Sequence, residues 1–143
     1  MLIGEFRHNL DQKGRLAIPA KFKNTFAEGL VITRGLDNCL FVFPKREWEK
    51  VVEKLTKLPL SQKDSRAFMR FLLSGAYESD LDNQGRLLIP EYLRNYAQLK
   101  KRVVIIGLYT RLEIWDEKLW EEYEKEREEQ AQEIAERLSD LGI

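Results

Sequence analysis

The sequence has one cysteine and one histidine, and this scarcity excludes several kinds of chemistry. Cys39 has no partner within the chain, so an intramolecular disulfide and a cysteine-based metal cluster are both excluded. Its place in the apolar run 39–43 favours a small buried side chain over a reactive thiol. The chain also lacks a glycine-rich phosphate loop and a His/Asp/Glu cluster at metal spacing. We therefore expect no enzyme, no metal and no cofactor.

Long apolar stretches are missing as well. No run approaches the roughly 20 residues of a membrane span, and residues 1–11 lack the apolar core and cleavage site of a secretion signal. Hydrophobic residues make up 43% of the chain and charged residues 34%, a balance typical of a folded globular protein. We expect a cytoplasmic protein with no membrane partner and no small-molecule substrate.

The sequence also lacks an excess of either charge, because Lys+Arg and Asp+Glu both total 24. Nucleic-acid binders are often basic overall, so this total argues against such a role. The distribution is uneven, however. Residues 45–75 carry eight basic and four acidic side chains, whereas residues 117–143 carry four basic and ten acidic ones. Residues 1–34 are also basic, with six cations and three acids. One face can therefore attract phosphate while the C-terminal segment does not.

An internal repeat is the strongest signal in the sequence. Residues 10–19 (LDQKGRLAIP) align with residues 81–90 (LDNQGRLLIP) at an offset of 71, and seven of the ten positions are identical. The alignment continues at an offset of 72, where Trp48 meets Trp120. A unit of about 45–50 residues buries too little surface to fold alone. The two copies should therefore pack against each other within one chain.

Each copy contains several short strands followed by a helix, which predicts a β-rich α+β fold. Apolar patterning predicts strands at 3–10, 15–18, 30–33, 40–43, 77–81, 86–89, 102–106 and 112–115. Helical segments are predicted at 20–24 and 45–55. A further helical stretch should end at residue 73, and a last helix should begin after the N-cap candidate Asp116. We divide the chain into a first module (1–54), a connecting helical segment (55–74), a second module (75–123) and a C-terminal helix extension (124–143).

The last helix has a broken apolar stripe and should dock against its own chain or a neighbouring subunit. The stripe consists of Trp120, Tyr123, Ala131, Ile134, Leu138 and Leu141.

The repeated Asp-x-x-Gly-Arg motif is the feature most closely tied to function. Its residues are Asp11, Gly14 and Arg15 in the first copy and Asp82, Gly85 and Arg86 in the second. The aspartate can hydrogen-bond its own downstream backbone and the glycine accepts a positive φ, so each motif predicts a stiff hairpin between its flanking strands. A purely structural turn, with Arg15 paired to Asp11, is one interpretation. Turn geometry does not demand the repeated arginine, however. We predict that Arg15 and Arg86 point outward, where a guanidinium suits phosphate or guanine O6 and N7.

Other polar side chains lie near these turns. Lys13, on the first tip, can bind phosphate, and Gln84 takes its place on the second, where it can bond a phosphate or a base edge. Weaker DNA-binding candidates are Lys21 and Lys23 on the following helical turn and Arg7 and His8 on the preceding strand. For His8, an ordinary strand position near the surface is the simpler interpretation.

These residues resemble the MraZ family of bacterial transcriptional regulators, whose two SpoVT/AbrB-like modules each carry an Asp-x-x-x-Arg motif. Residues 11–15 and 82–86 fit that motif, as do the preceding leucine and the following Leu-x-Ile-Pro. The resemblance implies a duplicated, AbrB-like swapped-hairpin β barrel and a ring homo-oligomer. It also implies a nucleoid-associated protein that binds double-stranded promoter DNA. The target would be tandem G-containing boxes upstream of the division and cell-wall operon that encodes the regulator, which it would repress.

Two other classes of function compete with this interpretation. An enzyme has no support in the residue set. An antitoxin-like or structural protein-interaction module remains open, because AbrB-like modules also occur in antitoxins. Such antitoxins usually have a disordered toxin-binding tail, whereas this C-terminal segment is predicted to be helical. A stable complex with a toxin would favour the module, and retention of promoter DNA would favour the regulator.

Overall fold

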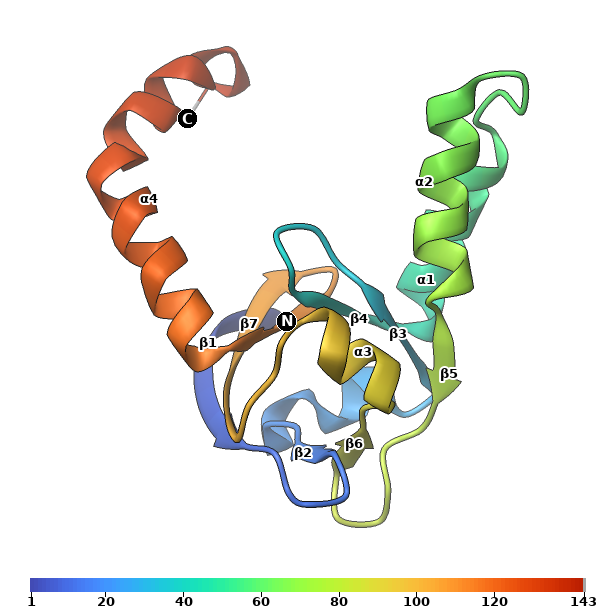
Figure 1. The fold of residues 1–143 in the computed structure, drawn as a ribbon, viewed down its shortest axis with the longest axis vertical. Helices are drawn as coiled ribbons and strands as arrows, with labels where there is room; N and C mark the ends of the chain where they lie inside the picture. Colours follow the sequence, from blue (N-terminus) through green and yellow to red (C-terminus); the bar gives the residue numbers. More distant parts are fainter. Residues whose placement is uncertain (143) are drawn as a thin grey trace.

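The computed structural model describes residues 1–142 and has an α+β architecture (Figure 1). The strands are β1 Leu2–Asn9, β2 Arg15–Ala17, β3 Leu30–Arg34, β4 Leu40–Pro44, β5 Tyr77–Ser79, β6 Arg86–Leu88, β7 Arg102–Tyr109 and β8 Leu112–Asp116. The helical segments are η1 Ala20–Phe26, α1 Lys45–Thr56, α2 Lys63–Ser74, α3 Glu91–Tyr96, α4 Glu117–Arg137 and η2 Ser139–Leu141. No described helix is long and apolar enough to cross a membrane.

The sheets combine strands from both copies of the repeat. Six strands form one sheet in the order β1-β7-β8-β4-β3-β5, and β2 pairs with β6 in a separate two-stranded ribbon. Exchanging each strand for its counterpart, β1 for β5 through β4 for β8, reverses the order of the large sheet and leaves it otherwise unchanged. The fold thus has an approximate internal two-fold axis. Equivalent residues of the two copies lie opposite each other at this axis. Leu16 pairs with Leu87 in the ribbon, and Phe41 pairs with Glu113 in the large sheet.

The predicted hairpins are wrong in their strand pairing. The strands on either side of the first turn do not pair with each other, because β1 pairs with β7 and β2 pairs with β6. The second turn behaves in the same way, since β5 pairs with β3. Turn chemistry acts over four or five residues and does not determine which strand a neighbouring segment joins. Both sheets are open, and no closed barrel is found among residues 1–142.

Apolar side chains from both copies fill a shared core. Leu16 and Leu87 are both fully buried beneath the ribbon, together with Phe22, Ile32 and Leu93. A second cluster surrounds Cys39, which is fully buried and donates its thiol hydrogen to the carbonyl of Leu36 at 3.1 Å. Burial raises the pKa of this thiol well above its ordinary range. Cys39 is therefore the inert buried side chain that the apolar run predicted.

The helices α1 and α4 occupy equivalent positions. Trp48 of α1 packs on Phe43 with ring centroids 5.6 Å apart, and Trp120 of α4 packs on Trp115 at 5.2 Å. Asp116 caps α4 as predicted, accepting a hydrogen bond from the Leu119 amide. The two helical arms, α1–α2 and α4, project to the same side of the sheet, opposite the β2–β6 ribbon (Figure 1).

The last helix was expected to dock against its own chain or a neighbouring subunit, and the structure shows contact with its own chain only at the start of the helix. Trp120 and Tyr123 pack on Trp115, but no residue of α4 is buried.

Adjacent leucines of β6 should respond oppositely to truncation. Leu87 is fully buried opposite Leu16, whereas the Leu88 side chain is 43% exposed on the other face. We expect Leu87→Ala to lower the free energy of unfolding by about 2–5 kcal/mol through lost burial and a residual cavity. Leu88→Ala should cost less than about 1 kcal/mol. Urea denaturation followed by circular dichroism measures both, and equal losses would contradict the assignment of faces.

Candidate nucleic-acid interface

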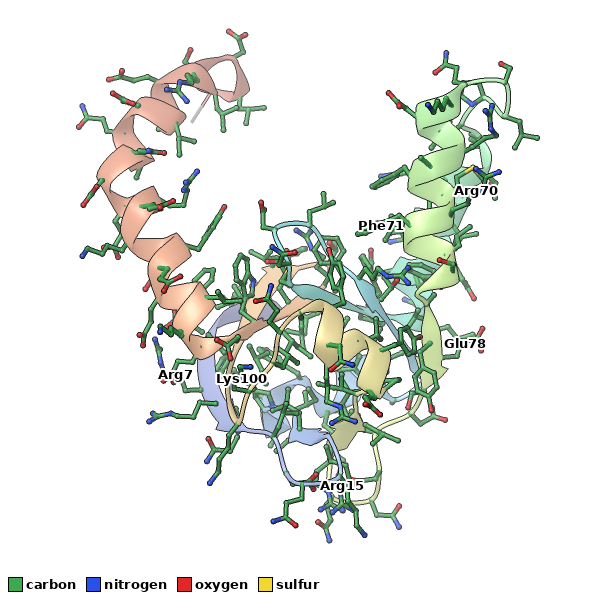
Figure 2. The ribbon with its side chains drawn as sticks, in the orientation of Figure 1. Arg7, Arg15, Arg70, Phe71, Glu78 and Lys100 are labelled. Atoms are coloured by element: carbon green, nitrogen blue, oxygen red, sulfur yellow. The ribbon has the colours of Figure 1, made fainter. Side chains whose placement is uncertain are left out.

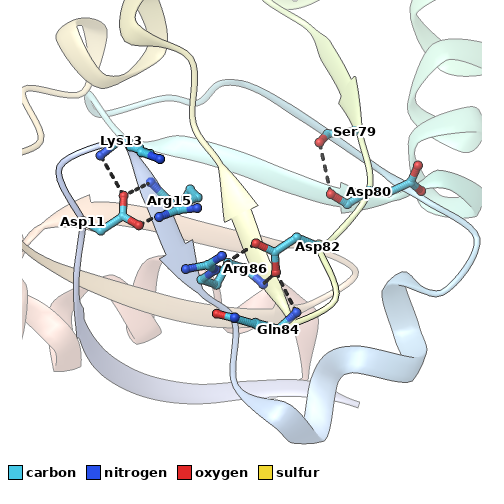
Figure 3. A network of polar contacts seen from close by, with 8 residues as sticks. All are labelled: Asp11, Lys13, Arg15, Ser79, Asp80, Asp82, Gln84 and Arg86. Atoms are coloured by element: carbon cyan, nitrogen blue, oxygen red, sulfur yellow. Dashed lines mark hydrogen bonds and ion pairs between the residues drawn. The ribbon is translucent and has the colours of Figure 1, made fainter.

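The β2–β6 ribbon places the two motif arginines side by side. Arg15 pairs with Leu88 and Arg86 pairs with Ala17 in the antiparallel register. Side chains alternate between the faces of a strand, so these four residues share the outer face while Leu16 and Leu87 turn into the core. The arginines are diagonal neighbours on this face, at a separation of about 7–8 Å between such positions. Figure 3 shows the two motifs together on the ribbon.

Each motif aspartate holds its arginine and the turn at once. Asp11 Oδ1 accepts hydrogen bonds from the backbone amides of Lys13 and Arg15, both at 2.9 Å. Asp11 Oδ2 accepts the Arg15 Nε hydrogen at 2.6 Å. The second copy repeats the network, with Asp82 accepting from the amides of Gln84 and Arg86 at 2.9 Å and from Arg86 Nε at 2.8 Å.

Each aspartate binds the Nε–H group of its arginine, and this leaves the two Nη atoms of the guanidinium available for other partners. Neither Nη atom of Arg15 or Arg86 donates a hydrogen bond to any described residue. The side chains are 30% and 27% exposed. Two parallel Nη–H donors form the planar fork that matches a phosphate or the O6 and N7 atoms of guanine. The structural and functional interpretations of the motif are therefore compatible, because the Asp–Arg pair orients the fork without occupying it.

The two turns also lock each other in place. The carbonyl of Gly14 accepts a hydrogen bond from the Ile89 amide at 2.8 Å, and the carbonyl of Gly85 accepts one from the Ile18 amide at 3.1 Å. Within each turn the glycine amide bonds back to the aspartate carbonyl, at 3.1 Å in the first copy and 2.9 Å in the second. Each tip is therefore braced by the other copy as well as by its own aspartate.

Arg94 belongs to this region and was missed by the sequence analysis. Its Nε donates to the Ile89 carbonyl at 2.9 Å, and its side chain covers Gly14 of the opposite copy. The repeat contained a signal, because Arg94 is the counterpart of Lys23 at the same offset of 71 as the motifs. The exposed Leu88 adds an apolar contact surface between the arginines.

The remaining predicted residues are dispersed. Lys13 and Gln84 are exposed at the turns. The Lys21 ammonium lies over the Phe6 ring, 4.6 Å from its centroid. Arg7 lies at the base of α4, away from Arg15 (Figure 2), and pairs with Glu5, Glu117 and Glu121. His8 is a partly buried strand residue beside it. The structure thus brings Lys13 and Gln84 together with the arginines, and places Arg7 elsewhere.

Known proteins similar to this chain share its full length. A family model described as "MraZ protein, putative antitoxin-like" matches residues 1–71 and again residues 72–141. Curated relatives named "Transcriptional regulator MraZ" include those of Caldanaerobacter subterraneus subsp. tengcongensis, 51% identical, and Halothermothrix orenii, 52% identical. A third, from Moorella thermoacetica, is 50% identical. Each alignment covers all of this chain and all of the relative.

The two turn glycines should differ in their tolerance of a methyl group. Both have positive φ, +81° at Gly14 and +75° at Gly85, a conformation that costs an L-residue about 1–2 kcal/mol. A Cβ at Gly14 would also lie 2.9 Å from Arg94 Nε and 3.1 Å from the Ile89 carbonyl oxygen, whereas one at Gly85 meets nothing within 4 Å. We expect Gly14→Ala to be the more destabilising, by about 1 kcal/mol or more. Thermal unfolding of both variants, and of Gly14→Ala with Arg94→Ala, measures this. A gap that persists unchanged in the double variant would refute the role of Arg94.

The motif aspartates should also make the free energy of unfolding depend on pH in the acid range. Backbone amide donors, first that of the arginine, and the guanidinium hold the pKa of Asp11 and of Asp82 below the ordinary value. A lowered folded-state pKa stabilises the fold fully above the unfolded value of about 3.9 and loses that effect as the pH falls through the folded value. The stability difference between the wild type and Asp11→Asn/Asp82→Asn should therefore be constant at pH 5–8 and shrink below pH 4. Urea midpoints across this range test it, and a constant difference down to pH 2.5 would count against the prediction.

Proposed function

The chain belongs to the MraZ family, and on that premise we propose that it is a DNA-binding transcriptional regulator that reads promoter DNA with Arg15 and Arg86. The observation that carries this proposal is the pair of outward guanidinium forks, each held at Nε by its own aspartate on one rigid ribbon. The names of the relatives support the regulatory role.

The shape of the site suits the major groove of DNA. That groove admits a two-stranded β ribbon, and guanine presents two acceptors there to an arginine fork. The outer face of β2–β6 would enter the groove with both arginines on base edges. Leu88 and Ala17, on the same face, suit the methyl group of thymine. Lys13, Gln84 and Arg94 lie at the margin, where phosphate contacts fix the register but carry no sequence information. Lys21 and Arg7 would contribute only from further away.

In this proposal the two repeats act together as one DNA-contacting unit. The proposed modules 1–54 and 75–123 would each contribute one strand to the ribbon of β2 and β6, with 55–74 connecting them and 124–143 extending the last helix. A single module would present one arginine on an unpaired strand.

One such unit makes few contacts with DNA, so the proposal includes several copies of the protein that bind DNA together. A few phosphate and base contacts bind weakly at physiological salt. Copies joined in a ring homo-oligomer and matched to tandem G-containing boxes gain affinity through effective concentration. The target would be the promoter of the division and cell-wall operon that encodes the regulator, which it represses. This target, the cytoplasmic location and nucleoid association follow from the family resemblance.

An antitoxin-like protein-interaction module is the alternative, and the description of the family model favours it. That function would need a toxin partner bound by the C-terminal segment. Here that segment is the ordered helix α4. A stable one-to-one complex with a co-encoded toxin, combined with no binding to promoter DNA, would support the alternative over the regulator.

Removing either arginine should weaken DNA binding without unfolding the protein. Each lost base contact should cost about 1–3 kcal/mol, or roughly 5- to 150-fold in affinity for a single box. Arg15→Ala should have the larger effect, because Lys13 adds a charge where the second turn has Gln84. Arg70→Ala removes an exposed arginine of α2, far from the ribbon, and is the matched control (Figure 2). Electrophoretic shift assays at one fixed salt concentration measure all three. Unchanged affinity in both ribbon variants would end the proposal.

A further inference from the structure

The two sides of the ribbon differ in charge, although they are built from equivalent strands. The first motif follows β1, where the Leu10 amide donates to the Lys101 carbonyl at 2.7 Å. The second motif follows β5, whose last residue, Ser79, pairs with Leu30 of β3. The β1–β7 and β3–β5 pairs form opposite ends of the six-stranded sheet, so the strand ends next to the motifs lie on either side of the β2–β6 ribbon (Figure 1).

Three consecutive cations lie where β7 begins, and we call them the basic flank. They are Lys100, Lys101 and Arg102, and all three are exposed. Arg102 pairs through Nε with Glu117 at 3.2 Å, yet its side chain remains 69% exposed. The ammonium groups of Lys100 and Lys101 have no ion-pair or hydrogen-bond partner among residues 1–142. The basic flank therefore carries positive charge that the described part of the chain does not neutralise.

The backbone of the basic flank is held in place by hydrogen bonds. The Lys100 amide donates to Asp116 Oδ1 at 3.1 Å, and the Lys101 carbonyl accepts the bond from the end of β1 described above. A hollow of about 390 Å³ lies beside it, lined by His8, Asn9 and Lys101 among others. Lysine, arginine and asparagine side chains commonly contact the phosphate and sugar oxygens of DNA. The basic flank thus offers such donors on a fixed frame directly beside the first motif.

The equivalent place on the other side of the ribbon is acidic. Glu28, Glu78 and Asp80 lie there, all exposed, and we call them the acidic flank. At the repeat offset of 72, Glu28 takes the place of Lys100. A hollow of about 410 Å³ lies beside them, and Lys45 is the one cation among the described residues that line it. Carboxylates at this place repel a phosphate, whereas the basic flank attracts one.

We propose that the basic flank binds phosphates of one DNA backbone, whereas the acidic flank faces the other backbone and repels it. The major groove is about 12 Å wide and is bordered by both backbones, so a ribbon within it brings the strand ends on either side toward phosphates. Each cation that neutralises a phosphate releases counterions, which supplies affinity without reading sequence. This inference rests on the proposed function, because it takes the entry of the ribbon into the groove as its premise.

Removing charge from the basic flank should weaken binding to every DNA sequence alike. Lys100→Gln/Lys101→Gln should bind a short duplex with one promoter box roughly 10- to 60-fold more weakly at 0.1 M salt, because two phosphate contacts are lost. The slope of log K against log salt concentration should flatten by about 1.8. A scrambled duplex should lose affinity by the same factor. Fluorescence anisotropy titrations at several salt concentrations measure all of these quantities.

The matched control removes the same charge from the far side of the sheet. Lys63→Gln/Arg70→Gln replaces two exposed cations of α2, away from the ribbon (Figure 2), and should change neither the affinity nor the salt slope. An affinity and a slope that stay at their wild-type values in Lys100→Gln/Lys101→Gln would overturn the inference.

Reversing the charge of the acidic flank tests the one-sided arrangement. Glu28→Lys/Asp80→Lys gives both sides of the ribbon the same sign, so binding should tighten by roughly 10-fold or more at 0.1 M salt and its salt slope should steepen. If circular dichroism shows that this variant does not fold, Glu28→Gln/Asp80→Asn removes the same carboxylates and should also tighten binding. Equal or weaker binding by the folded variant would refute the place of the acidic flank beside the second backbone.

Arg15→Ala separates this inference from the proposed function. It should abolish the preference for the box over the scrambled duplex and leave the effect of the basic flank on the salt slope intact. If Arg15→Ala loses that preference while Lys100→Gln/Lys101→Gln binds like the wild type, the flank inference fails alone. If Arg15→Ala keeps the preference while Lys100→Gln/Lys101→Gln weakens binding to both duplexes, the proposed reading of DNA by the arginines fails and the phosphate contact stands.

Discussion

The pairing of β2 with β6 is the contact on which the rest of the molecule depends. Three residues from each copy form the ribbon, and its two faces have different roles. The inner leucines close the shared core, while the outer arginines are held at a defined spacing. Each turn is bonded to the other copy through its glycine carbonyl, so the two tips brace each other. The core leucines and the motif arginines thus lie on opposite faces of the same two short strands. A substitution that disturbs the packing of the leucines should therefore also disturb the positions of the arginines.

Most of the local structure could be predicted from the sequence, because it follows from local patterns. The repeat predicted two equivalent units, the turn residues predicted both tight turns, and Asp116 predicted the start of α4. The pairing of the strands could not be predicted, since a turn between β1 and β2 is equally consistent with those strands joining different sheets. Arg94 was missed for a related reason. The repeat offset aligns it with Lys23, but it does not show that the Arg94 side chain crosses to Gly14 of the other copy.

The zero net charge is consistent with the charge distribution in the structure. Each motif arginine is accompanied by an aspartate that orients it, so the proposed contact of the ribbon with DNA would depend on geometry more than on a strong positive field. The large excesses of charge lie on the helical arms, on the far side of the sheet from the ribbon. Overall composition would therefore be a poor indicator of the proposed DNA binding, which uses few, oriented contacts.

Phe41 of β4 pairs with Glu113 of β8, and this pair restricts which halves of the chain can join in one sheet. Glu113 is buried, accepts the Trp115 indole hydrogen at 3.1 Å and pairs with Arg111 at 2.9 Å. If two second halves from different chains joined about the same axis, two such carboxylates would stand directly opposite each other, which is destabilising in a sheet. A symmetric pair of second halves is thus disfavoured at this position, so the second half pairs better with the first half than with another copy of itself.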